Sequence, residues 1–385
     1  MNYPDAVWDF IEENQAQDPN QLALKLAKQN NAAKEFILQQ INGKQKAKEK
    51  FPFLLDLEKF LYPSKRAIEQ ASSEITARHK AQQIAGKRMA DLSGGMGVDS
   101  FFFAQKFEAV YYLERKAELV GLAEQNAKLM GLENMICKQG NAEDFLKQTS
   151  EKFDWLYLDP DRRKKEKRFH RIEDCEPNVL DLLPNLLQLS ENILIKLSPL
   201  IDLKDVLKQI SQCEEIQVIG VKNECKEVLA FINKAHQGGA RIKAIDLKGS
   251  VKINYSFKFE EEEASAVYFH EPLNYLYEPN ASILKAGAFK KIAADFKLYK
   301  LAQHTHLYTS ERLEKEFPGR IIKIDWWGNP QNGKCQSANV VKRNFPLSVA
   351  QIRKKYKIKE SLKSYCYACT LNNDKRIFIT GELIN

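Results

Sequence analysis

The stretch Met89–Asp99 combines an acid with a glycine-rich turn. Its sequence, MADLSGGMGVD, is typical of an apolar strand that ends at Asp91, a tight turn and the start of a helix. Glycine permits positive φ and lets a ligand approach the backbone closely. The first turn of a helix also offers unpaired N–H groups to a carboxylate or phosphate. The stretch therefore predicts a ligand-binding turn, although a sharp turn without a ligand uses similar residues.

Further strands follow at the spacing of a doubly wound parallel sheet, and polar residues stand at their ends. The second strand ends at Glu114, where such a sheet holds ribose hydroxyls. The next two lead into GNAED at residues 140–144 and DPDRR at residues 159–163. We expect these strands over residues 109–113, 135–137, 153–158 and 193–197.

Together these pieces resemble the class I S-adenosylmethionine (SAM)-dependent methyltransferases over about residues 74–225. DLSGGMGVDS matches their first motif, GNAED the loop that touches the adenine, and LDPDRR the catalytic loop after their fourth strand. The resemblance implies an α/β fold with a Rossmann-like domain, and SAM as the cofactor. The residues that it assigns to the cofactor are Asp91, Ser93, Gly94, Gly95, Gly97, Asp99, Glu114, Asn141 and Ala142.

A nucleotide-dependent dehydrogenase is the alternative for the glycine-rich turn. Its G-x-G-x-x-G spacing is absent, because Ser100 takes the third glycine's place if Gly95 and Gly97 are the first two. SAM has no pyrophosphate to cradle, so a shorter glycine loop suffices.

The catalytic loop departs from the pattern of the amino-group methyltransferases, which have Asp or Asn, two prolines and an aromatic residue. The resemblance assigns catalysis to Asp159, Pro160, Asp161 and Arg162. Asp159 can still accept a hydrogen bond from a substrate amine and orient its lone pair toward the methyl group. Arg162, or an aromatic residue elsewhere such as Phe169, would have to stack on the base.

Methylation of uridine carbon 5 is disfavoured. That reaction needs a nucleophilic cysteine after the fifth strand, where this chain has Ser198-Pro199.

A basic run follows the catalytic loop directly. Charge runs are usually solvated surfaces, but this one stands at the mouth of the expected site, which favours contact with phosphates. The expected RNA-binding residues are Arg162, Arg163, Lys164, Lys165, Lys167, Arg168 and Arg171.

Composition indicates an ordinary cytoplasmic protein. The 385 residues have a formal net charge of +8, and 44% of them are hydrophobic. No apolar run approaches the roughly 20 residues that span a bilayer, and the acidic start is no secretory signal. The seven scattered cysteines suggest reduced thiols. The lone C-x-x-C of Cys366 and Cys369 lacks two further zinc ligands, so we expect no metal. The sequence does not indicate an oligomeric state.

We expect a helical N-terminal region over residues 1–85, a methyltransferase domain over 86–271, a ferredoxin-like segment over 272–320 and a THUMP-like domain over 321–385. The last two form a small α+β module. HTHLYTS at 304–310 and FPGRI at 317–321 resemble a group of bacterial methyltransferases with such domains, and THUMP domains imply RNA binding.

Several local elements can also be predicted. Gly43 should end a helix, a short helix should run from Cys225 to Asn233, and another should lie near Glu311–Phe317. Residues 366–369 and 377–379 should form a hairpin.

The sequence thus predicts a SAM-dependent methyltransferase that modifies a base nitrogen of RNA (tRNA or rRNA) by in-line attack, with Asp159 positioning the nucleophile. Two alternatives remain open. The chain could methylate a protein or small molecule, with the basic run gripping an acidic substrate. It could also be an RNA-binding protein whose methyltransferase fold is inactive, which the altered DPDR loop would support.

Overall fold

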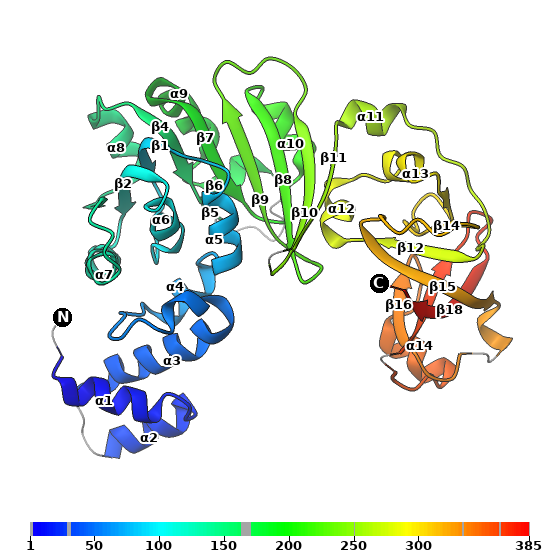
Figure 1. The fold of residues 1–385 in the computed structure, drawn as a ribbon, viewed down its shortest axis with the longest axis horizontal. Coiled ribbons are helices and arrows are strands. Elements are labelled where there is room, and N and C mark those ends of the chain that lie inside the picture. The colour runs from blue at the N-terminus through cyan, green and yellow to red at the C-terminus, as the bar shows by residue number, and fades with distance from the viewer. Residues whose placement is uncertain are drawn as a thin grey trace. The chain divides into compact units, whose positions relative to one another are not determined.

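The computed structural model describes residues 3–28, 32–162, 171–249, 251–332, 335–361 and 363–384 (Figure 1). The chain divides into two compact units. The first comprises residues 1–213 and 230–237, and the second comprises residues 214–229 and 238–385.

The first unit begins with a series of helices, the first three of which pack their apolar residues into one core. They are α1 (Asp5–Asn14), α2 (Pro19–Lys28), α3 (Lys34–Lys50), the 3-10 turn η1 (Pro52–Leu54), α4 (Lys65–Gln70) and α5 (Glu74–Ala81). Trp8, Leu22 and Ile41 are among the buried side chains of that core.

The expectation that Gly43 ends a helix was wrong, because α3 continues through it to Lys50. A Cβ on Gly43 would lie 2.2 Å from the Cβ of Tyr62. Glycine is therefore needed here for the close approach of the segment after η1, and not to terminate the helix.

A parallel sheet follows the N-terminal helices. Its strands are β1 (Gly86–Asp91), β2 (Phe107–Glu114), β3 (Met135–Gln139), β4 (Phe153–Leu158) and β7 (Ser190–Leu197). Their order is β7-β4-β1-β2-β3, and all neighbours are parallel. The carboxyl ends of these strands consequently meet at one edge, where the chemistry-bearing residues of the sequence also lie.

Helices and one short ribbon connect these strands. The helices are α6 (Val98–Phe103), α7 (Ala117–Leu129), α8 (Ala142–Gln148), α9 (Val179–Leu189) and α10 (Leu203–Gln209), and η2 (Ile172–Asp174) is a 3-10 turn. β5 (Asp161–Arg162) and β6 (Cys175–Glu176) form an antiparallel pair, and β5 consists of the last two residues of the expected catalytic loop.

The N-terminal helices are joined to the sheet domain through a buried amide. Asn126 on α7 accepts a hydrogen bond from the backbone N–H of Leu61 at 2.8 Å and donates one to the carbonyl of Leu61 at 2.9 Å. Both residues are almost fully buried, at 1% and 4% exposure. The side chain of Asn126 thus replaces the backbone partner that Leu61 would have in a sheet.

The second unit contains β10 (Arg241–Lys248), β11 (Val251–Phe257) and α11 (Phe259–Ala264), together with most of β8 (Cys213–Val221) and residues 224–229 of β9 (Glu224–Asn233). The expected helix from Cys225 to Asn233 was wrong, because this segment is strand β9. Its residues 228–232 are all buried, as in a strand covered on both faces. Lys222 and Asn223, with φ of 53° and 60°, form the two-residue turn that favours a hairpin.

The C-terminal part of the second unit is a seven-stranded sheet with the order β13-β14-β12-β15-β18-β17-β16. The strands are β12 (Tyr275–Pro279), β13 (Tyr299–Lys300), β14 (Tyr308–Ser310), β15 (Gly319–Gly328), β16 (Asn339–Arg343), β17 (Ser364–Thr370) and β18 (Arg376–Leu383). The helices are α12 (Ala281–Ala286), α13 (Lys291–Asp295) and α14 (Val349–Tyr356), with the 3-10 turn η3 (Pro330–Asn332).

The expected hairpin over residues 366–379 was confirmed as β17 and β18. The helix expected near Glu311–Phe317 was wrong, because those residues form turns and bends.

A buried carboxylate connects four strands of this sheet. Glu278 on β12 is 2% exposed and accepts hydrogen bonds from Arg320, Arg343 and the hydroxyl of Tyr367. Because both of its oxygens have cationic or polar partners, the charge can remain buried.

Within the described ranges, no helix combines the length and the apolar character needed to cross a bilayer. No group of three or more metal-ligating side chains occurs in the same ranges.

We expect Asn126→Ala to lower the free energy of unfolding by about 2–5 kcal/mol, because it leaves the buried N–H and carbonyl of Leu61 unpaired. Urea denaturation measures this change. Glu124→Ala, which removes an exposed ion pair on the same helix, is the matched control and should change the value by less than about 1 kcal/mol. Equal effects of the two substitutions would contradict this account of how the N-terminal helices are held.

Candidate active site

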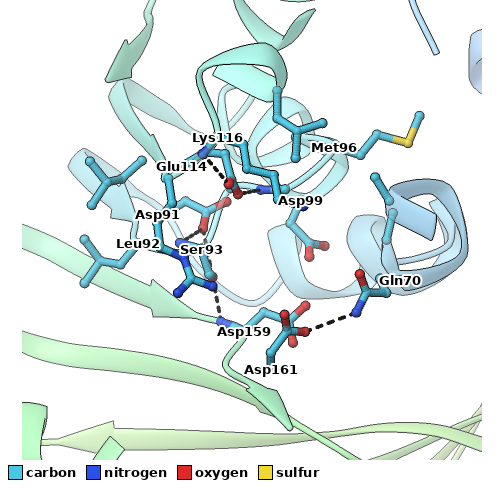
Figure 2. A pocket seen from close by; sticks show the side chains of 18 of the residues that line it. Gln70, Asp91, Leu92, Ser93, Met96, Asp99, Glu114, Lys116, Asp159 and Asp161 are labelled. Carbon is cyan, nitrogen blue, oxygen red and sulfur yellow. Dashed lines mark hydrogen bonds between the residues drawn. The ribbon is translucent and has the colours of Figure 1, made fainter. Parts of the chain in front are cut away.

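A pocket lies at the carboxyl edge of the parallel sheet, between β1, β2 and β4 (Figure 2). Residues from the segment around α4 complete its wall, among them Arg66, Gln70 and Ser72. The predicted site residues that line it are Asp91, Ser93, Gly94, Gly95, Gly97, Asp99, Glu114, Asn141, Ala142, Asp159 and Asp161. The fold therefore brings together residues that are separated by up to 70 positions in the sequence.

The buried carboxylate of Asp91 fixes the turn between β1 and α6 through hydrogen bonds. Its carboxylate accepts hydrogen bonds from the backbone N–H of Ser93 at 3.0 Å, the hydroxyl of Ser93 at 3.2 Å and the hydroxyl of Ser100 at 2.6 Å. The side chain is 1% exposed. Burial raises the pKa of Asp91 to about 7, although these hydrogen bonds oppose the shift.

The glycines of the turn are required by its geometry. Gly95 and Gly97 have φ of 57° and 88°, which side chains rarely adopt. A Cβ on Gly94 would lie 2.2 Å from the ring of Tyr112. The Tyr112 hydroxyl also donates to the carbonyl of Gly95 at 2.6 Å. The turn is thus packed tightly on one side, and its backbone forms part of the pocket wall on the other.

Glu114, at the end of β2, is joined to the same turn. One carboxylate oxygen accepts from the backbone N–H of Gly95 at 3.0 Å, and the other accepts from the backbone N–H of Lys116 at 2.9 Å (Figure 2). Each carboxylate oxygen has a second lone pair, so this side chain can still accept hydrogen bonds from a ligand diol.

Asn141 has a structural partner within the expected adenine loop. Its side chain caps α8 by accepting from the backbone N–H of Asp144 at 2.8 Å and donating to the Asp144 carboxylate at 2.8 Å. Ala142, the next residue, is buried. Both residues line the pocket, and the cap fixes where the loop lies.

Asp159 follows β4 and is tied to the glycine-rich turn. Its backbone N–H donates to the hydroxyl of Ser93 at 2.7 Å. Its carboxylate forms an ion pair with Lys196 on β7. Burial raises the pKa of Asp159, and Lys196 opposes that shift. Nearby, Asp161 accepts from the Gln70 side chain at 3.3 Å (Figure 2).

Sequence reasoning missed the cations of this site. Lys80 on α5 is fully buried and lies 3.2 Å from Asp99, which also accepts from the hydroxyls of Ser72 and Tyr157. Burial alone would raise the pKa of Asp99, but Lys80 and Lys196 hold it below its usual value. A lysine within the apolar run ILIKL was the available signal for Lys196. Lys80 lies in a polar stretch, where a lysine does not stand out from its neighbours.

The structure does not place every predicted residue at the pocket. Pro160 is buried and is not among the lining residues, and the backbone of Arg162 belongs to β5. Arg171 is exposed and forms an ion pair with Glu173 at 2.8 Å. Arg163, Lys164, Lys165, Lys167, Arg168 and Phe169 lie outside the described residues.

Comparison with known families identifies two domains in the second unit. A model described as a ferredoxin-like domain matches residues 275–318, and one described as THUMP domain-like matches residues 331–382. No curated protein matches the chain.

Comparison with solved structures finds a likeness over the whole chain. A "putative methyltransferase" from Porphyromonas gingivalis W83 is 28% identical, with a TM-score of 0.90 and coverage of 100% of both chains. M. capricolum TrmK with S-adenosylhomocysteine is 17% identical over 42% of this chain and 69% of that one, with a TM-score of 0.34. An rRNA methylase from Streptococcus thermophilus is 15% identical over 41% of this chain and 94% of that one, with a TM-score of 0.31. The last two scores are too low to bear on this chain.

These findings confirm the predicted fold. The chain has a class I SAM-dependent methyltransferase fold, a helical N-terminal region and C-terminal ferredoxin-like and THUMP-like domains.

The buried Asp91 predicts a pH-dependent stability. Its pKa is about 7 in the folded chain against an ordinary value of 3.8. The folded state therefore holds an extra proton between these values, and the stabilisation is complete below about pH 4 and lost as the pH rises through 7. We expect the melting temperature of the ligand-free protein to fall between pH 5 and 8 more steeply than that of Asp91→Asn, whose amide does not titrate. Parallel curves for the two proteins would show that Asp91 is already ionised at pH 5.

Proposed function

We propose that this chain transfers a methyl group from SAM to a base nitrogen of RNA (tRNA or rRNA). The proposal is carried by one observation: Asp159 lines the same pocket as the glycine-rich turn and Glu114. A group that can orient a nucleophile thus lies beside a site suited to an adenosine-containing cofactor.

The residues of the pocket fit SAM. Glu114 would hold the ribose hydroxyls, because it ends the second strand of a doubly wound sheet. Asp91, Ser93 and Asp99, with the backbone of Gly94, Gly95 and Gly97, would surround the methionine part, and Asn141 and Ala142 the adenine. When bound, SAM supplies an electrophilic methyl group on its sulfonium sulfur.

Asp159 would act on the nucleophile. Its backbone is held by Ser93 and its carboxylate by Lys196, so its position is set before a substrate arrives. Preorganised orientation of this kind is what in-line methyl transfer requires. Pro160, Asp161 and Arg162 would shape the surrounding loop.

RNA is the proposed substrate because of the THUMP domain-like match over residues 331–382 and the basic run from Arg162 to Arg171. Lysine and arginine side chains that neutralise phosphates dominate the affinity of proteins for nucleic acids. We place the domain boundaries after residues 85, 271 and 320, and the protein in the cytoplasm.

Transfer of labelled methyl from SAM into total bacterial RNA that lacks the modification tests the proposal. We expect label in RNA with the wild type and a loss of at least about 100-fold with Asp159→Ala, because the nucleophile is no longer oriented. Asp181→Asn, an exposed acid on α9, is the control and should retain full activity.

The other outcomes separate the alternatives. If the protein binds SAM but no label enters RNA, the substrate is instead a protein or a small molecule. Binding of RNA with neither SAM binding nor methyl transfer would identify an RNA-binding protein with an inactive methyltransferase fold.

Glu114→Ala should weaken SAM binding by about 10- to 100-fold, because hydrogen bonds to a charged group contribute roughly 1.5–3 kcal/mol. Isothermal titration calorimetry measures this affinity. Glu118→Ala, on the following helix α7 and outside the pocket lining, serves as the control. An unchanged affinity in Glu114→Ala would mean that the diol is held elsewhere.

A further inference from the structure

The Asp159 carboxylate, which would contact the substrate, forms an ion pair with Lys196 through one of its two oxygens. Lys196 extends from β7, the strand beside β4, and its Nζ contacts Oδ2 of Asp159. The two side chains are 14% and 32% exposed. Asp159 lines the pocket, and its second carboxylate oxygen, Oδ1, has lone pairs for a further donor. Lys196 is not itself among the lining residues, but a substrate held by Asp159 would have a cationic donor next to that acceptor.

The pair belongs to a cluster with balanced charge. Lys80 and Asp99 form the second ion pair, and the four groups interact electrostatically with one another. Two ammonium groups against two carboxylates allow these charges to remain in a largely buried place. Lys196 is therefore kept in position by a network and does not depend on Asp159 alone.

Several nucleobase edges offer a donor next to an acceptor. Adenine, cytosine and guanine present an exocyclic amine beside a ring nitrogen, whereas guanine (at N1) and uracil also present a ring N–H beside a carbonyl oxygen. Each could place its N–H on Asp159 and its acceptor on Lys196. Hydrogen bonding alone does not choose between these two classes.

The positive charge of Lys196 distinguishes the amine edges from the lactam edges. An ammonium group on the ring nitrogen of adenine or cytosine withdraws electron density from the amine and weakens it as a nucleophile. On a carbonyl oxygen, the same cation stabilises the negative charge that develops when the neighbouring N–H loses its proton. Lys196 therefore opposes methylation of an amine and promotes methylation of a lactam nitrogen.

We propose that the methylated atom is the ring nitrogen of a lactam, N1 of guanine or N3 of uracil, with Asp159 as general base and Lys196 as the donor to the adjacent carbonyl oxygen. The inference rests on the proposed function and defines its substrate class. It also gives the DPDR loop an acid-base task, which the resemblance to amino-group methyltransferases did not predict.

The step balances without a further reactant. The ring N–H proton moves to Oδ1 of Asp159, and the nitrogen lone pair forms the new N–C bond as the C–S bond of the cofactor breaks. The sulfur keeps the bonding electrons and becomes a neutral thioether. Lys196 stays protonated throughout, and Asp159 later releases its proton to water. Burial, which raises the pKa of Asp159, makes it a better base than an exposed carboxylate.

Identification of the methylated nucleoside is the first test. The full-length protein is incubated with SAM and RNA from cells that lack the modification, and the RNA is digested and analysed by mass spectrometry. We expect 1-methylguanosine or 3-methyluridine. N6-methyladenosine, N4-methylcytidine, N2-methylguanosine or 1-methyladenosine would overturn this inference and leave the proposed function intact. No methylated nucleoside at all would overturn both.

Substitution of Lys196 is the second test. Lys196→Met should lower kcat by about 100-fold or more, as expected for the loss of one donor to a developing oxyanion, while SAM affinity changes less than about threefold. Lys196→Arg keeps the cation and should recover at least a tenth of the activity. Lys152→Met, an exposed lysine that donates to the backbone carbonyl of Gln188, is the matched control.

The pH profile separates a catalytic from a merely structural role of Lys196. A lactam N–H ionises without assistance in alkaline solution, so the deficit of Lys196→Met relative to the wild type should shrink as the pH rises to about 9. An exocyclic amine has no such ionisation. If the loss of activity in Lys196→Met stays constant with pH, the inference is overturned. It is also overturned if Lys196→Met methylates RNA as fast as the wild type.

Discussion

One hydroxyl connects the two halves of the candidate site. Ser93 donates to the buried carboxylate of Asp91 and accepts the backbone N–H of Asp159. This hydroxyl therefore joins the turn that would hold the cofactor to the loop that would hold the substrate, beside the hydrogen bond from the N–H of Leu92 to the carbonyl of Tyr157. Asp91 is buried and accepts from Ser93 and Ser100, so the position of this hydroxyl is set by satisfied hydrogen bonds in a place of low dielectric. Together with the pairing of β1 with β2 and with β4, it sets where Glu114 and Asp159 lie.

Buried charge is the second constraint, and each unit meets it by pairing. In the first unit Lys80, Asp99, Asp159 and Lys196 balance one another beside the pocket. In the second unit Glu278 is held by Arg320, Arg343 and Tyr367. A buried charge without such partners would cost several kcal/mol. The cluster in the first unit differs because two of its members, Asp99 and Asp159, also line a pocket, where Asp159 could act on a substrate.

The N-terminal helices take part in this arrangement. They supply Ser72 and Lys80 to Asp99 and several residues of the pocket wall. Asn126 joins the segment at Leu61 to α7, which keeps that wall attached to the sheet domain. The first unit thus combines the helical region and the parallel sheet into one body, and the site depends on both.

The sequence by itself determined the strands, the glycine-rich turn and the acids at the strand ends, because these depend on local periodicity and on backbone conformations that few residues adopt. Asp91, Glu114 and Asp159 could be placed at one edge from strand order alone. Tertiary structure decided the rest. Gly43 lies inside a helix, where the lack of a side chain makes room for Tyr62, and residues 224–233 form a strand whose inner positions are buried on both faces. The partnership of Lys80 with Asp99 and of Lys196 with Asp159 joins elements distant in the chain. Such contacts arise from the packing of these elements, and a local sequence pattern cannot predict them.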